Sequence, residues 1–122
     1  MKPANISTFN ITKGNTYNEI LVFNEREDNV VTPLDLTQYT NIKQDIRRRI
    51  TINSELLHSC DLTDGISISG SDNNILNIII PSTEVATWNG GTYYRDITVT
   101  DGWGHIYTYC TGKIQVRENI TE

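Results

Sequence analysis

A strict two-residue alternation in residues 41–50 limits what this chain can fold into. One set of alternate positions holds Ile42, Gln44, Ile46, Arg48 and Ile50, and the other holds Lys43, Asp45, Arg47 and Arg49. A helix would distribute these charges around its circumference, whereas an extended strand places the two sets on opposite faces. The pattern therefore predicts a strand with one largely apolar face.

The same alternation recurs along the chain, and the composition favours strands over helices. The 122 residues include 17 Ile and 16 Thr but only 2 Ala. β-Branched side chains fit a pleated surface, whereas Ala is the best helix former. We expect about seven to eight strands in an all-β, immunoglobulin-like two-sheet sandwich, with a β-barrel as the alternative. The other strand candidates are residues 9–11, 17–23, 56–60, 66–68, 75–80, 92–100 and 105–116.

The segments between these candidates give weaker signals. Residues 25–29 are polar and predict a hairpin loop, and residues 30–36 predict an irregular or edge segment because Pro33 interrupts them. Residues 82–88 form the only helical candidate, with Ser82 as its cap. In the last strand, regular alternation places Tyr107, Tyr109, Thr111 and Lys113 on one face, opposite Ile106, Thr108, Cys110, Gly112, Ile114 and Val116.

Size and charge restrict the partners. We expect residues 1–122 to form one domain, with its core in about 9–116 and polar terminal segments. The net charge of −5 argues against nucleic-acid binding, which needs clustered Lys and Arg. The first residues lack the apolar run of a signal peptide, and no apolar run approaches the roughly 20 residues that cross a bilayer. We therefore expect neither a nucleic-acid nor a membrane partner, and synthesis in a cytoplasm.

The sequence contains no recognisable catalytic motif. A zinc site would have to use His58, Cys60, His105 and Cys110, but their spacing matches no finger or ribbon. Asp64, Asp72 and Asp101 are interpreted as solvated turn residues rather than paired catalytic carboxylates. We expect no catalytic residue, no metal and no cofactor, and we interpret the two cysteines as buried free thiols, with one disulfide as the alternative.

Candidate partner contacts come from the late aromatic residues and from the only basic run. Exposed Trp and Tyr side chains are favoured anchors of protein interfaces. Trp88 and Tyr93 are assigned to the core, and the same exposed residues leave a sugar-binding surface as an alternative. The predicted partner contacts are Trp103, Tyr107 and Tyr109, together with Arg47 and Arg49 for an acidic partner surface.

Two motifs in the right order suggest a family. The first is Asp35-Leu36-Thr37-Gln38-Tyr39-Thr40, followed by the 42–47 strand, and the second is the 91–101 segment GTYYRDITVTD, followed by Gly104 and by GKIQV at 112–116. Over about residues 9–116 the chain resembles an immunoglobulin-like domain of phage and prophage virions. That domain occurs as the N-terminal domain of baseplate upper proteins. Similar modules occur in accessory capsid and head-fibre proteins of tailed phages, crAss-like phages included. The chain departs from the pattern where Gln38 replaces a Gly and where Arg95-Asp96 replaces Tyr-Asp.

The resemblance implies a non-enzymatic virion protein. Because the chain ends soon after the domain, we expect an accessory (decoration) capsid protein or a head-fibre anchor, assembled in the cytoplasm of a bacterial host. The expected partners are capsid, fibre or tail proteins, and self-association is left open. The alternatives are a tail or baseplate adaptor and a carbohydrate- or receptor-binding sandwich. Tyr93, after Gly90-Gly91, resembles the tyrosine of a tyrosine corner.

Overall fold

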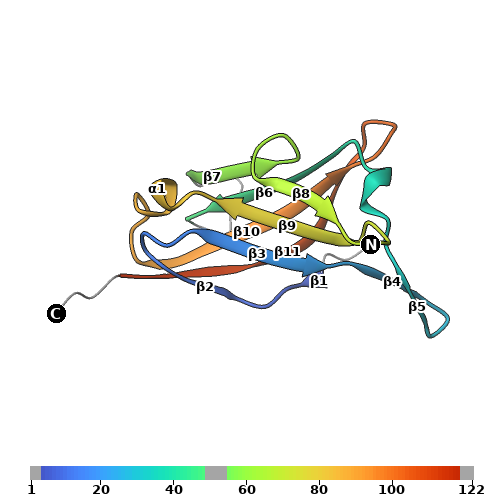
Figure 1. Cartoon of the computed structure of the whole chain (residues 1–122), viewed down its shortest axis with the longest axis horizontal. Helices are drawn as coiled ribbons and strands as arrows, with labels where there is room; N and C mark the ends of the chain where they lie inside the picture. The colour runs from blue at the N-terminus through green and yellow to red at the C-terminus, as the bar shows by residue number, and fades with distance from the viewer. Residues whose placement is uncertain (1–3, 49–54, 119–122) are drawn as a thin grey trace.

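A computed structural model of the chain describes residues 4–48 and 55–118. Its regular structure is almost entirely β, with two main sheets that lie one in front of the other in Figure 1 and a separate two-stranded hairpin. The larger sheet has the order β1-β11-β10-β6-β7, with β2 also paired to β11, and the smaller has the order β3-β9-β8. The strands of the larger sheet are β1 (Ala4–Asn5), β2 (Phe9–Thr12), β6 (Asn41–Arg47), β7 (Leu56–Asp61), β10 (Gly91–Thr100) and β11 (Ile106–Arg117). Those of the smaller sheet are β3 (Tyr17–Val22), β8 (Ile66–Ser69) and β9 (Ile75–Ile80).

The alternation in residues 41–47 is confirmed. Ile42, Gln44 and Ile46 are buried between the sheets, and the charged positions between them are only partly covered on the outer face. The inner face of β10 also follows its predicted alternation, with Tyr93, Arg95, Ile97 and Val99 all buried. The core therefore lies between the two sheets, where side chains of both meet.

The described residues contain more strands than expected, for two reasons. The N-terminal strand is divided into β1 and β2, and both run parallel to β11. The hairpin predicted at residues 25–29 is present, but its loop is shorter than predicted, because β4 (Asn24–Glu27) pairs with β5 (Val30–Pro33) and only Asp28 and Asn29 form the turn. Asp28 and Asn29 have φ values of 50° and 67°, as a tight hairpin turn requires, and these residue types tolerate that conformation.

Two short helices complete the elements. η1 (Leu36–Gln38) follows Asp35, whose carboxylate accepts a hydrogen bond from the Thr37 amide at 2.9 Å. α1 (Ser82–Val85) lies within the predicted helical segment, but Pro81 occupies the cap position and no side chain caps the helix, so the role assigned to Ser82 is wrong. Neither helix in the described residues is long and apolar enough to span a membrane.

A β-bulge in β11 overturns the predicted faces of that strand. Ile97 pairs with Cys110 but Thr98 pairs with Thr108, so Tyr109 is the extra residue. One extra residue inverts the alternation on its N-terminal side. Tyr107 consequently lies opposite the buried Val99 and does not share a face with Thr111.

Candidate interaction surface

One buried polar cluster links the two sheets. The Arg95 side chain, on β10, is fully buried and forms an ion pair with Glu19 of β3, with 2.9 Å between Nη2 and Oε2. Arg95 Nη1 also donates to the Tyr17 hydroxyl at 3.0 Å and to Gln44 Oε1 at 3.2 Å, and the Tyr17 hydroxyl donates to Glu19 at 2.7 Å. We call these four residues the polar clamp.

The electrostatics of the polar clamp keep its charge pair intact. Burial opposes the charge of Arg95, but its hydrogen bond to Glu19 and the nearby charges hold the Arg95 pKa above its usual value. Burial raises the pKa of Tyr17 far above the usual range, so its hydroxyl stays protonated. Arg95 Nη2 also donates to the Ser7 carbonyl at 3.2 Å, which ties the segment between β1 and β2 to the core. The clamp therefore joins both sheets and the N-terminal segment.

Tyr93 forms the predicted tyrosine corner. Its ring is buried near the start of β10, and its hydroxyl donates to the Asn89 carbonyl at 2.7 Å. Trp88, also predicted to be a core residue, is buried and donates from Nε1 to Glu84 of α1 at 3.1 Å. These contacts fix the connection between the smaller and the larger sheet.

Several connecting segments gather at the opposite end of the sandwich from α1. Figure 1 shows the β10–β11 turn, η1 and the β4–β5 hairpin at this end. Asp101 shapes the turn, because its Oδ1 accepts from the amides of Trp103 and His105, each at 2.9 Å. Burial opposes the charge of Asp101, but these two hydrogen bonds hold its pKa below its usual value. Gly104, with a φ of 85°, closes the turn in a conformation that favours glycine.

The two sequence motifs meet at this turn. The Thr40 hydroxyl, from the first motif, lies 3.3 Å from the carbonyl oxygens of Thr100 and Asp101, in the second. The Thr40 amide also donates to the Thr100 carbonyl at 2.8 Å. Tyr39 contacts the Tyr109 ring at 6.3 Å between centroids. The motif residues thus hold the β10–β11 turn against the segment that contains η1.

The predicted aromatic contacts divide into two groups. Trp103 is 87% exposed, and Tyr107 remains 47% exposed beyond the end of the core. Tyr109, in contrast, packs against Phe23 and Tyr39 and supports the turn from within. The prediction that Tyr107 and Tyr109 share the outward face of the strand is wrong, because the bulge intervenes.

The exposed apolar surface at this end is larger than the sequence suggested. Val30 and Val31, beside the tip of the β4–β5 hairpin, are 58% and 52% exposed, and Ile106 is 68% exposed. The missed signal was the Asp28-Asn29 pair, because these residue types tolerate the positive φ of a tight hairpin turn. We define the loop-end surface as these exposed apolar residues in two groups, Val30 and Val31 on the β4–β5 hairpin and Trp103, Ile106 and Tyr107 at the β10–β11 turn, which Figure 1 shows at different corners of this end.

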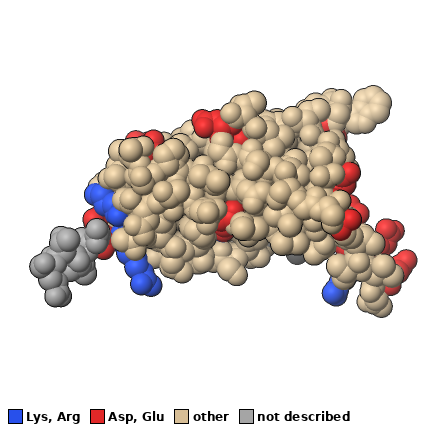
Figure 2. All heavy atoms as spheres, viewed as in Figure 1, with Lys and Arg blue, Asp and Glu red and all other residues tan. Residues whose placement is uncertain are grey.

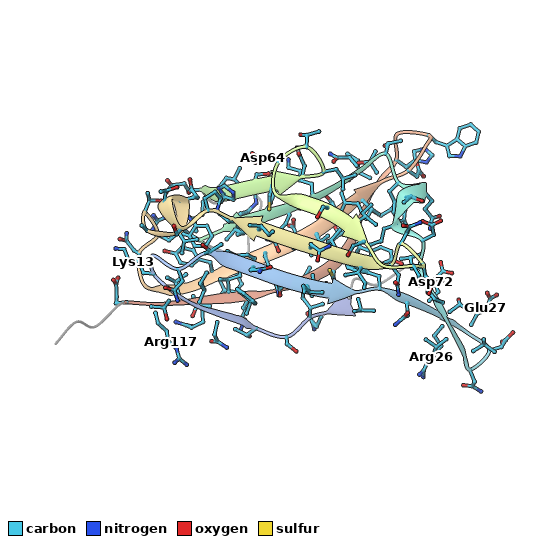
Figure 3. All side chains as sticks on the ribbon, in the orientation of Figure 1. Lys13, Arg26, Glu27, Asp64, Asp72 and Arg117 are labelled. Atoms are coloured by element: carbon cyan, nitrogen blue, oxygen red, sulfur yellow. The ribbon has the colours of Figure 1, made fainter. Side chains whose placement is uncertain are left out.

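Charges are distributed unevenly along the molecule. Figure 2 shows mainly acidic side chains around the end that carries the β4–β5 hairpin, and both basic and acidic side chains at the opposite end. Figure 3 locates Glu27 and Asp72 at the hairpin end, together with Arg26, and Lys13 and Arg117 at the other. In this view, the charged side chains near the loop-end surface are therefore mainly acidic.

Of the two basic contacts predicted in the 47–49 run, Arg47 does not join this surface. Arg47 lies opposite Tyr94 near the start of β10, whereas Trp103 follows the end of that strand. Its Nη2 is 3.6 Å from Asp45, and it lines a pocket of about 410 Å³ beside Tyr94 and Lys113. Arg49 lies outside the described residues.

The residues considered for catalysis or metal binding are dispersed. His58 is 3.6 Å from Glu84, and His105 is 3.5 Å from Asp101. Asp64 and Asp72 lie well apart in Figure 3. Within the described ranges 4–48 and 55–118, no group of three or more His, Cys, Asp or Glu residues could hold a metal ion.

Both cysteines are buried free thiols, as predicted. Burial raises the pKa of Cys60 and of Cys110 to about 11. At neutral pH both side chains are therefore protonated, apolar parts of the core.

Comparisons with known proteins show the fold of the chain and no more. No model of a protein family matches the sequence, and no curated protein matches it. A chicken TCR structure is similar, with a TM-score of 0.50 and 14% identity, over 98% of this chain and 55% of that one. CopC from Methylosinus trichosporium OB3b aligns with a TM-score of 0.40 and 15% identity, over 66% of each chain. The chain is an immunoglobulin-like β-sandwich.

Within this class, the polar clamp occupies a distinctive position. In antibody domains a disulfide joins the two sheets, and its second Cys follows the corner tyrosine by two residues. The residue two positions after Tyr93 is Arg95, which forms an ion pair with Glu19 on the opposite sheet. An ion pair therefore joins the sheets where antibody domains have a disulfide. The signal in the sequence was a charged residue, Arg95, among the alternate positions that also hold Tyr93, Ile97 and Val99.

Proposed function

We propose that the chain is a non-enzymatic structural protein of a phage virion, an accessory capsid or head-fibre-anchoring protein that binds another virion protein through the loop-end surface. The observation that carries the binding proposal is the 87% exposure of Trp103 on a turn whose backbone is fixed by Asp101. Trp residues that become buried on binding are frequent hot spots of protein interfaces. A turn that is already rigid loses less conformational entropy when it binds.

The arrangement of the two motifs supports the virion assignment. The residues that resemble the phage domain are those that hold the Trp103 turn, through Thr40, Thr100 and Asp101. A motif that shapes a presented turn suits a module whose task is attachment. Most charged groups near the core, Arg95 and Glu19 among them, are engaged in structural contacts, which suits a non-enzymatic role.

The chemistry of the loop-end surface suggests what it binds. Four aliphatic or aromatic side chains accompany Trp103, and Glu27 and Asp72 lie at the same end. Apolar anchors surrounded by charge are typical of protein interfaces, where the charges guide orientation. We expect a partner surface with an apolar pocket and a basic rim.

Purified particles test this proposal. Particles of the phage or prophage that encodes the chain should contain it when analysed by mass spectrometry. Trp103→Ala should strongly reduce the copies per particle, whereas Ile79→Ala should not, because Ile79 is exposed on β9, away from this end. Absence of the wild-type protein from particles would contradict the virion proposal, and equal incorporation of both variants would contradict the assigned surface.

A second candidate follows from the same exposed indole. An exposed Trp ring also suits stacking on a sugar, which would make the chain a carbohydrate-binding sandwich. A glycan array distinguishes the two, since this candidate requires wild-type binding that Trp103→Ala abolishes. No binding by the wild-type protein rejects it.

A further inference from the structure

One edge of the smaller sheet is unpaired. In the described part of the chain, β3 pairs with β9 and with no other strand. Neither β1 nor β2 pairs with the free side of β3, because both pair with β11. An unpaired edge presents a row of backbone amide and carbonyl groups to any strand that approaches.

This edge lacks the features that usually prevent strand addition. β3 has six residues, contains no Lys, Arg or Pro, and pairs with β9 without a register shift. The other edge of the same sheet, β8, has only four residues. In the larger sheet, β7 pairs with β6 across an irregularity, and the opposite edge is divided into β1 and β2. Short or irregular edge strands resist pairing with another strand. Among the edges of the two main sheets in the described residues, β3 is therefore the one most open to strand addition.

The outward side chains beside this edge are uncharged, and several of them are exposed apolar residues. Ile20 and Val22 on β3 are 63% and 61% exposed, and Ile79 on β9 is 49% exposed. The remaining outward positions of the three strands hold only Asn, Ser and Ile: Asn18, Ser67, Ser69, Ile75 and Asn77. The single charged residue of β3, Glu19, points inward and is paired with Arg95.

There is also space beside the edge. A groove of about 560 Å³ lies between residues 18–21 and the N-terminal segment 5–9. Apart from Glu19, its lining residues are uncharged. A strand that approaches β3 would enter a groove whose other wall is segment 5–9, and it would meet no opposing charge there.

We propose that a second copy of this chain occupies the edge, with the two β3 strands antiparallel about a two-fold axis and the two smaller sheets joined into one. A two-fold interface requires a surface that fits itself. A charged edge would repel its own copy in a protein of net charge −5, but this edge is neutral. A partner chosen by charge would find no countercharge here, whereas an identical apolar edge is complementary.

The pattern of β3 also determines the register. In a joined sheet, residues with outward side chains must pair with residues of the partner strand that also have outward side chains. The two-fold axis between the two β3 strands therefore passes through Glu19, Ile20 or Leu21. An axis at Glu19 places two carboxylates opposite each other, which is destabilising, and an axis at Leu21 shortens the overlap. The remaining register places Ile20 opposite Ile20 of the partner subunit.

Cysteine cross-linking tests both the interface and its register. Ile20→Cys should form an intermolecular disulfide on mild oxidation, since opposite residues in a sheet have Cα atoms within the range that disulfides span. Val22→Cys is the matched control because its exposure is nearly the same. In the proposed register its two copies are about 13 Å apart along the strands, too far to cross-link. The native thiols are buried and do not interfere.

Light scattering of the wild-type chain provides the second measurement. We expect twice the monomer mass of 13.8 kDa at about 100 µM protein. Ile20→Lys should restore the monomer, whereas Val31→Lys, an exposed position on the hairpin, should leave the dimer intact. A monomeric wild-type protein overturns the proposal, and the β3 edge would then bind a strand of another protein or no strand. Equal cross-linking of Ile20→Cys and Val22→Cys overturns it as well.

Discussion

The polar clamp and the loop-end surface depart from the usual placement of side chains in opposite ways, since the clamp buries charges and the loop-end surface exposes apolar groups. Arg95 and Glu19 are charged, yet they lie in the core and bind each other across the two sheets. Trp103 is largely apolar, yet the Asp101 turn keeps it in solvent. A buried charge is tolerated because its partner compensates it. The difference indicates that the clamp maintains the fold and that the loop-end surface is available for binding.

Removing half of the clamp should give the largest effect. Glu19→Leu leaves Arg95 buried without its counter-ion, and we expect a loss of about 3–5 kcal/mol in the free energy of unfolding. Urea denaturation measures this loss. Glu55→Leu is the control, because the Arg48–Glu55 pair is exposed and should contribute less than about 1 kcal/mol. Similar losses in both variants would show that the clamp contributes no more than a surface ion pair.

Alkaline pH should weaken the fold through the two thiols. Folding raises the pKa of Cys60 and Cys110 from about 9 to about 11, so their contribution is complete below pH 9 and is lost as the pH rises through 11. The expected loss is about 2–3 kcal/mol for each thiol. Unfolding measured between pH 8 and 11 should show a steep decline that flattens in the Cys60→Ala/Cys110→Ala double variant. An unchanged slope in the double variant would assign the decline to other groups.

Close packing beside the clamp should make Gly112 sensitive to substitution. A Cβ atom there would lie 2.9 Å from Ile6 Cγ1 and 3.3 Å from Arg95 Nε. Gly112→Ala should therefore cost about 1–3 kcal/mol, the usual range for overpacking. Gly102→Ala is the control, since no atom lies within 4 Å of its Cβ position. Equal stability of the two variants would mean that the N-terminal segment moves away freely.

Replacing both charges of the clamp should cost less than removing one. Glu19→Leu combined with Arg95→Met leaves no unpaired buried charge, and such replacements are often close to neutral. We expect most of the stability lost in Glu19→Leu to return. A double variant as unstable as Glu19→Leu would show that the hydrogen bonds to Tyr17 and Gln44 matter more than the charge pair.

The smallest effect on stability should come from the loop-end surface. Trp103→Ala should change the free energy of unfolding by no more than about 0.5 kcal/mol, as exposed sites usually do. Urea denaturation measures this alongside Glu19→Leu. A loss of several kcal/mol would mean that the indole supports the fold, and the separation between the two regions would then fail.

Local alternation allowed the inner faces of β6 and β10 to be predicted from the sequence. Each face depends on neighbouring residues alone, and the tyrosine corner likewise joins residues four positions apart. The bulge at Tyr109 and the division of the N-terminal strand depend on pairing with distant strands, so no local pattern indicated them. Glu19 and Arg95 are 76 positions apart, and only the fold brings them together.

The candidate site was predicted in part. The exposure of Trp103 followed from its place in a glycine-containing turn, and the structure leaves it exposed. Tyr109 was misassigned because the bulge turns it toward Phe23 and Tyr39. Val30 and Val31 were missed because the residues before them were interpreted as a loop rather than as a hairpin strand.

Hydrogen–deuterium exchange of the wild-type chain, free and bound to purified particles, shows which part of the molecule contacts the particle. Binding should slow exchange in residues 101–107 and at the tip of the β4–β5 hairpin, while exchange in β9 and α1 stays as it is in the free chain. Protection confined to other elements, with residues 101–107 unchanged, would contradict this prediction.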